Sequence, residues 1–184
     1  MEEKIVFSGI IGELIHMPQP DGRVFEKYRR SPGIRLIIIS AERKILITQE
    51  KRFESNTVDL RLPGGKVCDT LEDYRILKQS KVSLIEAAKE AAIKEALEET
   101  GLEIKAPSFL VKVNAGSTVE WDLYYFVVRN YSQHSDGQQL KHDEDIQVTW
   151  MTPEEIVSAI SAGKMQEWRS VGVLLGLVLP TLKP

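Results

Sequence analysis

Three glutamates that lie close together in the sequence are the first candidates for chemistry. Glu95, Glu98 and Glu99 belong to the segment 85–102, and at 100° per residue they fall within about 100° of one another on a helix. Three carboxylates on one face repel each other, and no lysine follows any of them four residues later. A divalent cation with oxygen ligands, such as Mg²⁺, would remove that repulsion. The alternative is an acidic helix face in contact with water, which binds nothing.

The same segment has the composition of a helix. Ala, Leu, Glu and Lys dominate it, and Glu90 precedes Lys94 by four residues, the favourable order for an ion pair. Gly101 stands where a helix commonly ends in a left-handed residue. Ala88 and Ala92 lie on the side of the three glutamates and leave room in front of the carboxylates. We therefore predict a helix over residues 85–100.

A Pro-Gly-Gly loop precedes this helix. Residues 62–66 read Leu-Pro-Gly-Gly-Lys, and a glycine-rich loop can bring backbone groups close to a metal ion or a phosphate. Glu86 is followed, after seven residues, by Lys-Glu-Ala-Leu-Glu-Glu-Thr-Gly-Leu at residues 94–102. In this spacing the sequence resembles the signature of the Nudix hydrolase family. That signature is Gly, five residues, Glu, seven residues, Arg-Glu, an apolar residue, any residue, Glu-Glu, any residue, Gly and an apolar residue.

Two features depart from that signature. Gly65 lies twenty-one residues before Glu86, where the family spacing is six, so about fifteen residues are inserted at about residues 68–83. The insert carries apolar residues at near-helical spacing and is expected to loop out as a helical flap, because the cost of closing a loop grows slowly with its length. Lys94 stands where the family has Arg, which keeps the charge and loses the planar guanidinium.

The resemblance implies a fold and a metal site. Nudix enzymes are α/β proteins that form an α/β/α sandwich with a mixed sheet, and they bind Mg²⁺, with Mn²⁺ as the alternative ion. On this sequence the implied metal ligands are the Gly64 carbonyl, Glu95, Glu98 and Glu99. The implied catalytic residues are Glu98, Glu144, Glu86 and Lys94, of which Glu86 would orient the helix or a ligand.

The N-terminal region resembles the ADP-ribose pyrophosphatase branch of the family, which includes hydrolases of other nucleoside diphosphate sugars. Residues 4–16 and 23–30 are expected to form a β-hairpin, joined by the turn-rich residues 17–22. In this branch such an extension packs on a partner subunit, which implies a homodimer. The domains are then residues 1–32, the β-hairpin extension, and residues 33–184, the catalytic domain. The alternative is a hairpin that folds onto its own chain.

The substrate-binding residues that the resemblance implies come from separate segments. Arg52 ends a basic-aromatic stretch that relatives place beside the nucleotide, where its guanidinium would hold a phosphate at two points; the alternative is an exposed charge. Arg30 precedes a Pro-Gly connection similar to that of the branch, and Gly65 lies in the signature loop. Glu120 follows a small-residue turn that borders the active site in this branch. Arg61 replaces a Glu that the ADP-ribose-cleaving relatives often carry, so details of their pocket do not transfer.

A polar loop at residues 131–144 is the expected source of a general base, because loops often deliver a catalytic group to a rigid scaffold. Its end resembles the acidic loop that supplies this base in ADP-ribose pyrophosphatases. We expect Glu144 to take the role, with His142 as the second choice since an imidazole titrates near neutral pH. Alternatively, the acidic residues only keep the loop hydrated.

Other segments are expected to build the sheet and its cover. Residues 34–39 and 44–49 are apolar, β-rich runs and are expected to be paired central strands. The further expected elements are strands over residues 107–114, 119–128 and 147–151, a helix that begins after Thr152, and an apolar final helix over residues 170–179.

Composition narrows the class of protein. The 184-residue chain has a net charge of −3 and no basic run with interleaved aromatic residues, which argues against a nucleic-acid surface. Its single cysteine, Cys68, excludes an intrachain disulfide and fits a reducing cytoplasm. We expect no signal peptide at the start and no membrane span, because the longest apolar run, residues 171–179, is too short for a bilayer.

The hypothesis that combines these observations is Mg²⁺-dependent hydrolysis of the diphosphate linkage in ADP-ribose or another nucleoside diphosphate sugar. The products would be a nucleoside monophosphate and a sugar phosphate, and the partner is thus a nucleotide-sugar small molecule. Two alternatives stay open: a hydrolase that sanitises nucleoside triphosphates, and a nucleotide-binding module without turnover. RNA decapping is disfavoured because the chain lacks a basic surface.

Overall fold

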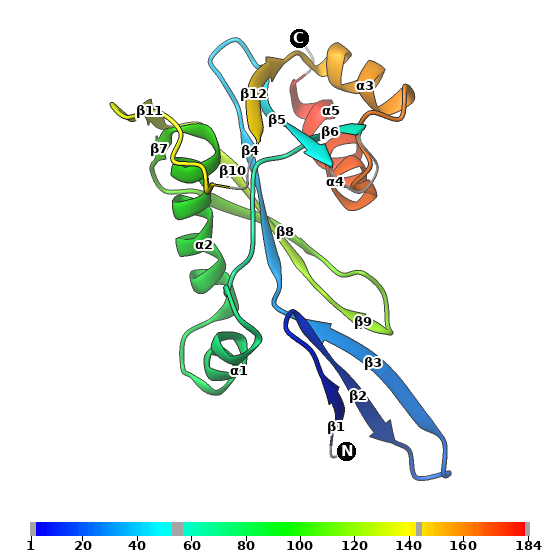
Figure 1. Cartoon of the computed structure of the whole chain (residues 1–184). Helices are drawn as coiled ribbons and strands as arrows, with labels where there is room; N and C mark the ends of the chain where they lie inside the picture. The colour runs from blue at the N-terminus through cyan, green and yellow to red at the C-terminus, as the bar shows by residue number, and fades with distance from the viewer. Residues whose placement is uncertain (1–2, 53–56, 143–144, 183–184) are drawn as a thin grey trace.

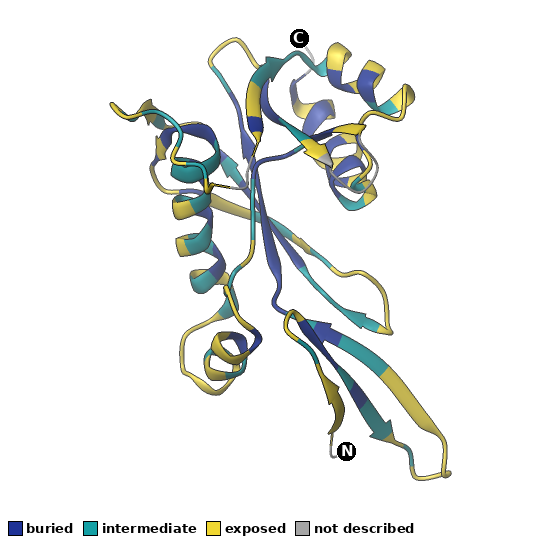
Figure 2. Cartoon of the chain, viewed as in Figure 1, coloured by how far each residue is buried: buried dark blue, intermediate teal, exposed yellow. Residues whose placement is uncertain are grey.

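The core of the protein is a mixed sheet. The computed structural model describes residues 3–52, 57–142 and 145–182. In its central sheet β10 (Leu123–Val128) runs parallel to β4 (Gly33–Ile38) and antiparallel to β8 (Ser108–Val113) (Figure 1). Every residue of β4 is buried (Figure 2), as expected for a strand that is covered on both faces.

Helices cover the two faces of this sheet. On one face lies α2 (Leu84–Glu95), whose Ala88 and Ala92 are fully buried against alternate residues of β4 and β10. The other face carries a second apolar cluster, formed with residues of the C-terminal helices. The predicted α/β/α sandwich is therefore confirmed (Figure 1). The C-terminal helices are α3 (Pro153–Ser161), α4 (Trp168–Val173) and α5 (Leu179–Leu182), with a π-helical segment, η2 (Leu174–Val178), between the last two.

The predicted glutamate helix is confirmed, with a wider last turn. Ser83 caps its start, since the Ser83 hydroxyl accepts a hydrogen bond from the Glu86 N–H at 3.1 Å. After α2 the chain continues as a π-helical segment, η1 (Ala96–Thr100), and ends at Gly101 with φ +68°. Segments of π-helix within α-helices are rare and often occur at functional sites. Two of the three glutamates, Glu98 and Glu99, belong to it.

The expected pairing of residues 34–39 with 44–49 is wrong. The second run is β5 (Ile45–Arg52), which pairs with β12 (Ile146–Met151) and β6 (Thr57–Arg61), and only the isolated bridge Ile39–Ile45 connects it to the end of β4. The free edge of β4 is taken by the signature loop instead. The Ile34 N–H donates to the Gly65 carbonyl at 2.9 Å, and the Leu36 N–H to the Pro63 carbonyl at 2.8 Å.

The N-terminal extension contains the predicted hairpin and one strand more. Residues 4–16 form two strands, because the Gly9 N–H donates to the Gly12 carbonyl at 2.8 Å and closes a turn between them. The apolar side chains of Ile10 and Ile11 in that turn concealed it in the sequence. The four strands of this sheet, in spatial order, are β1 (Lys4–Ser8), β2 (Gly12–Pro18), β3 (Val24–Arg30) and β9 (Val119–Glu120).

The insert folds as the helix α1 (Leu71–Gln79), which starts at a reciprocal cap between Thr70 and Asp73. Its Leu71 and Tyr74 are buried, so the insert packs on the protein. A network of ion pairs, here called the Glu13 network, joins α1 to the extension. Its centre is Glu13 of β2, whose fully buried carboxylate pairs with Arg29 at 3.3 Å and with Arg75 of α1.

Two elements complete the described part of the chain. The strands β7 (Leu102–Ile104) and β11 (Tyr131–Gln133) form a short antiparallel pair after α2. Within the described ranges, no helix combines the length and the apolar character needed to cross a membrane.

Candidate functional site

The signature loop places two glycines beneath the end of the glutamate helix. The Gly64 N–H donates to Oε2 of Glu99 at 2.7 Å. Gly64 has φ +148°, and a Cβ on it would lie 2.2 Å from the Ile34 carbonyl oxygen. Only glycine fits there, because any side chain would be strained and would collide with β4. The loop geometry thus fixes the position of Glu99.

Glu95 lies against the second glycine. A Cβ on Gly65 would lie 2.0 Å from Oε1 of Glu95, so the carboxylate rests directly on the Cα of this residue. The structure therefore brings together four residues that the sequence selected: Gly64, Gly65, Glu95 and Glu99. We call these four the carboxylate bend.

Glu99 is buried among charges of its own sign. Burial and the neighbouring carboxylates of Glu95 and Glu50 raise its pKa to about 8. The Gly64 N–H and the guanidinium of Arg35 act in the opposite direction. Without a metal ion, Glu99 therefore holds its proton at neutral pH, and an added cation would favour the ionised form.

This raised pKa predicts a pH dependence of stability. The unfolded Glu99 has its ordinary pKa near 4.3, so the folded protein binds one proton more between that value and about 8. Protonation of Glu99 then stabilises the fold fully below about pH 4.3, and this stabilisation disappears as the pH rises through about 8. In EDTA, the unfolding temperature should fall between pH 6 and pH 9, and Glu99→Gln should flatten this fall. A calorimetric series in which both proteins follow the same curve would contradict the assignment.

Glu98 points to lysines. Its Oε1 lies 3.7 Å from Nζ of Lys94, and its Oε2 lies 3.6 Å from Nζ of Lys141. Oε2 is buried and, among the described residues, has no hydrogen-bond partner. In the same residues no three acidic, histidine or cysteine side chains converge closely enough to hold a metal ion. Glu98 thus neighbours Glu99 in the helix, but its carboxylate contacts lysines and not the glycines of the carboxylate bend.

Two predicted catalytic residues lie at the margin of the helix. Lys94 is half exposed, and besides Glu98 its ammonium lies 3.8 Å from Oδ2 of Asp69. The Lys94 ammonium therefore lies within ion-pair distance of two carboxylates, those of Glu98 and Asp69. Glu86 is exposed in the first turn of α2, about 13 Å along the helix from Glu95. The structure therefore does not bring Glu86 to the carboxylate bend.

The predicted substrate-binding residues separate into two groups. Arg30 lies over the ring of Trp121, with its guanidinium carbon 4.4 Å from the ring centroid, and Arg169 of α4 lies 4.3 Å from the same centroid. The Trp121 ring nitrogen is close to the Cα of Gly33, which also faces the carbonyl of Gly65. Gly33 therefore has both the Trp121 ring and Gly65 of the carboxylate bend as neighbours.

Glu120 belongs to a different environment. Its Oε1 accepts from Arg29 at 2.9 Å and from the Tyr74 hydroxyl at 3.2 Å, and lies 3.4 Å from Lys78. Burial alone would raise the pKa of Glu120. The charges of Arg29 and Lys78 have the opposite effect and keep this pKa below its usual value. The structure thus ties Glu120 to the Glu13 network between extension and insert.

The remaining predicted residues are only partly visible. Glu144 lies outside the described residues, and so does the side chain of Arg52, although its backbone ends β5. His142 is exposed in a turn. Arg61, the replacement noted in the sequence, contacts Oδ2 of Asp59 at 2.8 Å and Oε2 of Glu50 at 3.4 Å.

The sequence analysis did not select three residues that the structure places at this site. Glu50 and Arg35 act on Glu99 through space, and Arg169 joins Arg30 on Trp121. Arg35 had a signal in the sequence, since it is the one charged residue in the apolar run 34–39. Glu50 and Arg169 had none, because they reach the site only through the tertiary fold.

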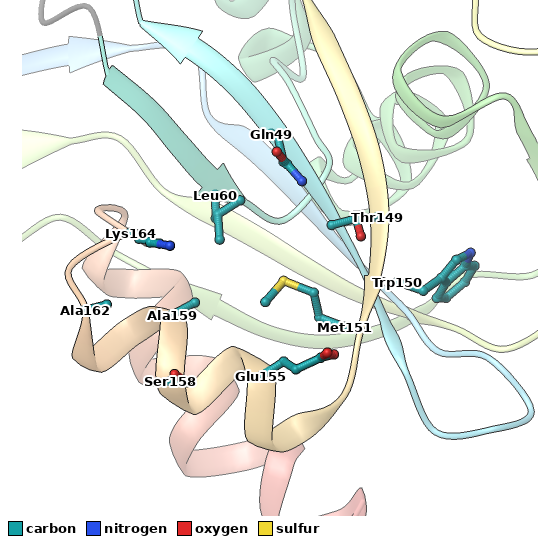
Figure 3. Close-up of a pocket in the computed structure, with 10 residues that line it drawn as sticks. All are labelled: Gln49, Leu60, Thr149, Trp150, Met151, Glu155, Ser158, Ala159, Ala162 and Lys164. Carbon is teal, nitrogen blue, oxygen red and sulfur yellow. The ribbon is translucent and has the colours of Figure 1, made fainter.

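A separate cavity of about 390 Å³ lies between the sheet β12–β5–β6 and α3 (Figure 3). Figure 3 shows the Met151 side chain near its centre and Trp150 directed away from it. Gln49 and Leu60, opposite one another on β5 and β6, line it. Side chains alternate along a strand, so Glu50 points to the other face of this sheet. The cavity is therefore distinct from the carboxylate bend.

Comparison with known proteins identifies relatives of this chain. The sequence model of the family described as NUDIX domain matches residues 29–171. Among solved structures, one described as the crystal structure of ADP compounds hydrolase is similar, with a TM-score of 0.66 and 16% sequence identity, over 95% of this chain and 89% of that chain. At that identity the likeness shows a common fold. No curated protein matches the sequence.

Proposed function

Since the chain belongs to the Nudix family and is a hydrolase of pyrophosphate bonds, we propose that it cleaves ADP-ribose or another nucleoside diphosphate sugar. The products would be a nucleoside monophosphate and a sugar phosphate. The observation that carries the proposal is the carboxylate bend, where Glu95 and Glu99 meet the backbone of Gly64 and Gly65. The name of the similar structure, a hydrolase of ADP compounds, supports the choice of nucleotide.

The donor set fits Mg²⁺, with Mn²⁺ as the alternative ion. Glu95, Glu98, Glu99 and the Gly64 carbonyl offer oxygen atoms, which hard divalent cations prefer. Two observations support this fit: the raised pKa of Glu99 beside Glu95, and the buried Oε2 of Glu98 without a hydrogen-bond partner among the described residues. When bound, such an ion supplies a positive charge for the diphosphate oxygens and a means of activating water.

The residues of the chain itself would bind and orient the substrate. The guanidinium groups of Arg30 and Arg169, both over the ring of Trp121, suit the phosphate oxygens. Glu144 or His142, and Glu98, are our proposed proton acceptors for the attacking water. Lys94 holds Glu98, and Glu86 stabilises the start of α2 through the helix dipole.

A substrate panel tests the reaction. With Mg²⁺, ADP-ribose and other nucleoside diphosphate sugars should release a nucleoside monophosphate, and EDTA should abolish this release. Chromatography of the products identifies them directly. The triphosphate-sanitising alternative would instead release pyrophosphate from nucleoside triphosphates, and the binding-module alternative would release nothing while still binding ADP-ribose.

We also propose that the protein is a homodimer. We propose a cytoplasmic location as well, which is in line with the free thiol of Cys68. The sheet of the extension exposes apolar side chains that a second copy could cover. Phe7, for example, is 65% exposed. The exposed apolar residues of this sheet and its turn are Ile5, Val6, Phe7, Ile10, Ile11, Val24 and Phe25.

A charge in this surface should separate the subunits. Phe7→Glu together with Phe25→Glu should convert a dimer into a monomer, since a buried unpaired carboxylate costs several kcal/mol (about 3–5). Light scattering after size-exclusion chromatography measures the mass. Val157→Glu, at an exposed position of α3, is the matched control and should leave the mass unchanged. A wild-type protein that is monomeric at all concentrations would refute the proposal.

A further inference from the structure

Arg35 is a buried cation in the middle of the central sheet. It is 7% exposed and sits in β4 directly beside Tyr125 of β10, in a run of residues that is otherwise apolar. Burying a guanidinium costs free energy unless an anion or several hydrogen-bond acceptors replace the water around it. Its retention at this position therefore requires a compensating interaction.

The direct contacts of Arg35 lead to the carboxylate bend. Its Nη1 donates to the Gly64 carbonyl at 2.9 Å and to the Ile34 carbonyl at 3.2 Å. In the part of the chain that the structure describes, no carboxylate forms an ion pair with it, and its Nε is buried without a partner. Two carbonyl groups alone are a weak compensation for a buried charge.

Through Gly64, Arg35 is connected to the candidate metal site. Arg35 holds the carbonyl of Gly64, whose own N–H donates to Glu99, and the charge of Arg35 acts on that carboxylate against the effect of Glu95 and Glu50. Before any metal ion enters, Glu99 is thus acted on by two acids, Glu95 and Glu50, and by the cation of Arg35, while Glu50 also pairs with Arg61 at 3.4 Å. In a medium of low dielectric constant, charges act on each other over several ångströms.

We propose that Arg35 is a positioning residue that serves as the resident counter-charge of the carboxylate bend. It stabilises the acidic cluster when no metal ion is bound, and it lowers the affinity for the divalent cation, so that the ion binds reversibly. This inference rests on the proposed function, since it assumes that the cluster binds a divalent cation. It goes further by assigning to this chain a determinant of metal affinity that the signature does not contain.

Two substitutions separate the charge of Arg35 from its hydrogen bond. Arg35→Gln removes the charge and keeps an N–H donor for the Gly64 carbonyl, whereas Arg35→Lys keeps the charge. Lys112→Gln, which removes an exposed cation paired with Asp122, is the control. The readouts are the dissociation constant of Mn²⁺ for the substrate-free protein, by calorimetry, and the unfolding temperature in EDTA and in Mg²⁺.

Arg35→Gln should bind Mn²⁺ about tenfold more tightly than the wild type, because one repelling charge is gone. It should also unfold at a lower temperature in EDTA and recover most of that loss in Mg²⁺. Arg35→Lys and Lys112→Gln should retain the wild-type dissociation constant. If Arg35→Gln does not fold alone, the added change Glu50→Gln should restore folding, since it removes one of the two acids whose effect on Glu99 Arg35 opposes.

The wild-type measurement tests whether the site binds a divalent cation, whereas the variants test the role of Arg35. A wild type that binds no Mn²⁺ would refute the proposed metal-dependent function and this inference together. A wild type that binds Mn²⁺, with Arg35→Gln binding it equally or more weakly, would refute only the role of Arg35. The role of Arg35 would also be refuted if Arg35→Gln lowered the unfolding temperature equally with and without Mg²⁺, or if Glu50→Gln did not restore folding. Arg35 would then only support the structure.

Discussion

Replacing Glu99 by Gln is expected to lower kcat for ADP-ribose about a thousandfold at saturating Mg²⁺. The amide has the shape of the carboxylate but no charge, so it cannot neutralise a divalent cation, and the loss of such electrostatic stabilisation is among the largest single effects in catalysis. Its oxygen can still accept the hydrogen bond from Gly64, and the repulsion from Glu95 disappears. The fold should therefore be kept, and circular dichroism should match that of the wild type.

Glu90 provides the control for this substitution. It lies in α2, the helix that continues into the segment of Glu99, and its side chain is exposed. Glu90→Gln should retain kcat within about twofold, because a surface charge contributes little. Near-normal turnover in Glu99→Gln would remove the metal assignment from this helix.

The second large effect is expected from the smallest change, Gly65→Ala. The new methyl group would occupy a point 2.0 Å from Oε1 of Glu95, so the carboxylate has to move by more than 1 Å. A displacement of this size at a catalytic group costs about a hundredfold in rate. We expect a weaker affinity for Mn²⁺ and a kcat/KM lowered by about that factor.

Gly172→Ala is the matched control for Gly65→Ala. Gly172 lies in α4, and a Cβ on it meets no atom within 4 Å. Alanine also favours the helix by about 1 kcal/mol, so this variant should be fully active and slightly more stable. If Gly65→Ala keeps its Mn²⁺ affinity and activity, Glu95 is not held against the bend for a metal ion.

The parts of the site that were predictable are those encoded locally. The phase of the glutamates follows from the helix period, and the end of the helix at Gly101 from the left-handed conformation that glycine permits. The Pro-Gly-Gly loop was recognisable because it requires residues without a side chain. Gly64, Glu95 and Glu99 were therefore predictable as neighbours, whereas the contacts of Glu98 with Lys94 and Lys141 were not.

The errors have a common cause, which is competition between partners far apart in the sequence. Residues 34–39 and 44–49 resemble a hairpin, but the signature loop occupies the edge of β4 that β5 would need. Strand pairing is decided by which partner buries more surface and satisfies more backbone groups, and a local pattern does not contain that information. The roles of Glu50 and Arg169 were missed for the same reason.

The Glu13 network makes the extension and the insert depend on each other. Glu13, Arg29 and Arg75 come from the extension and from the insert, and each neutralises charges of the other. A shortened protein that began at β4 would keep the whole signature but expose Arg75 and Tyr74 to water. The extension and the insert therefore form one structural unit, since removal of either takes away an ion-pair partner of the other.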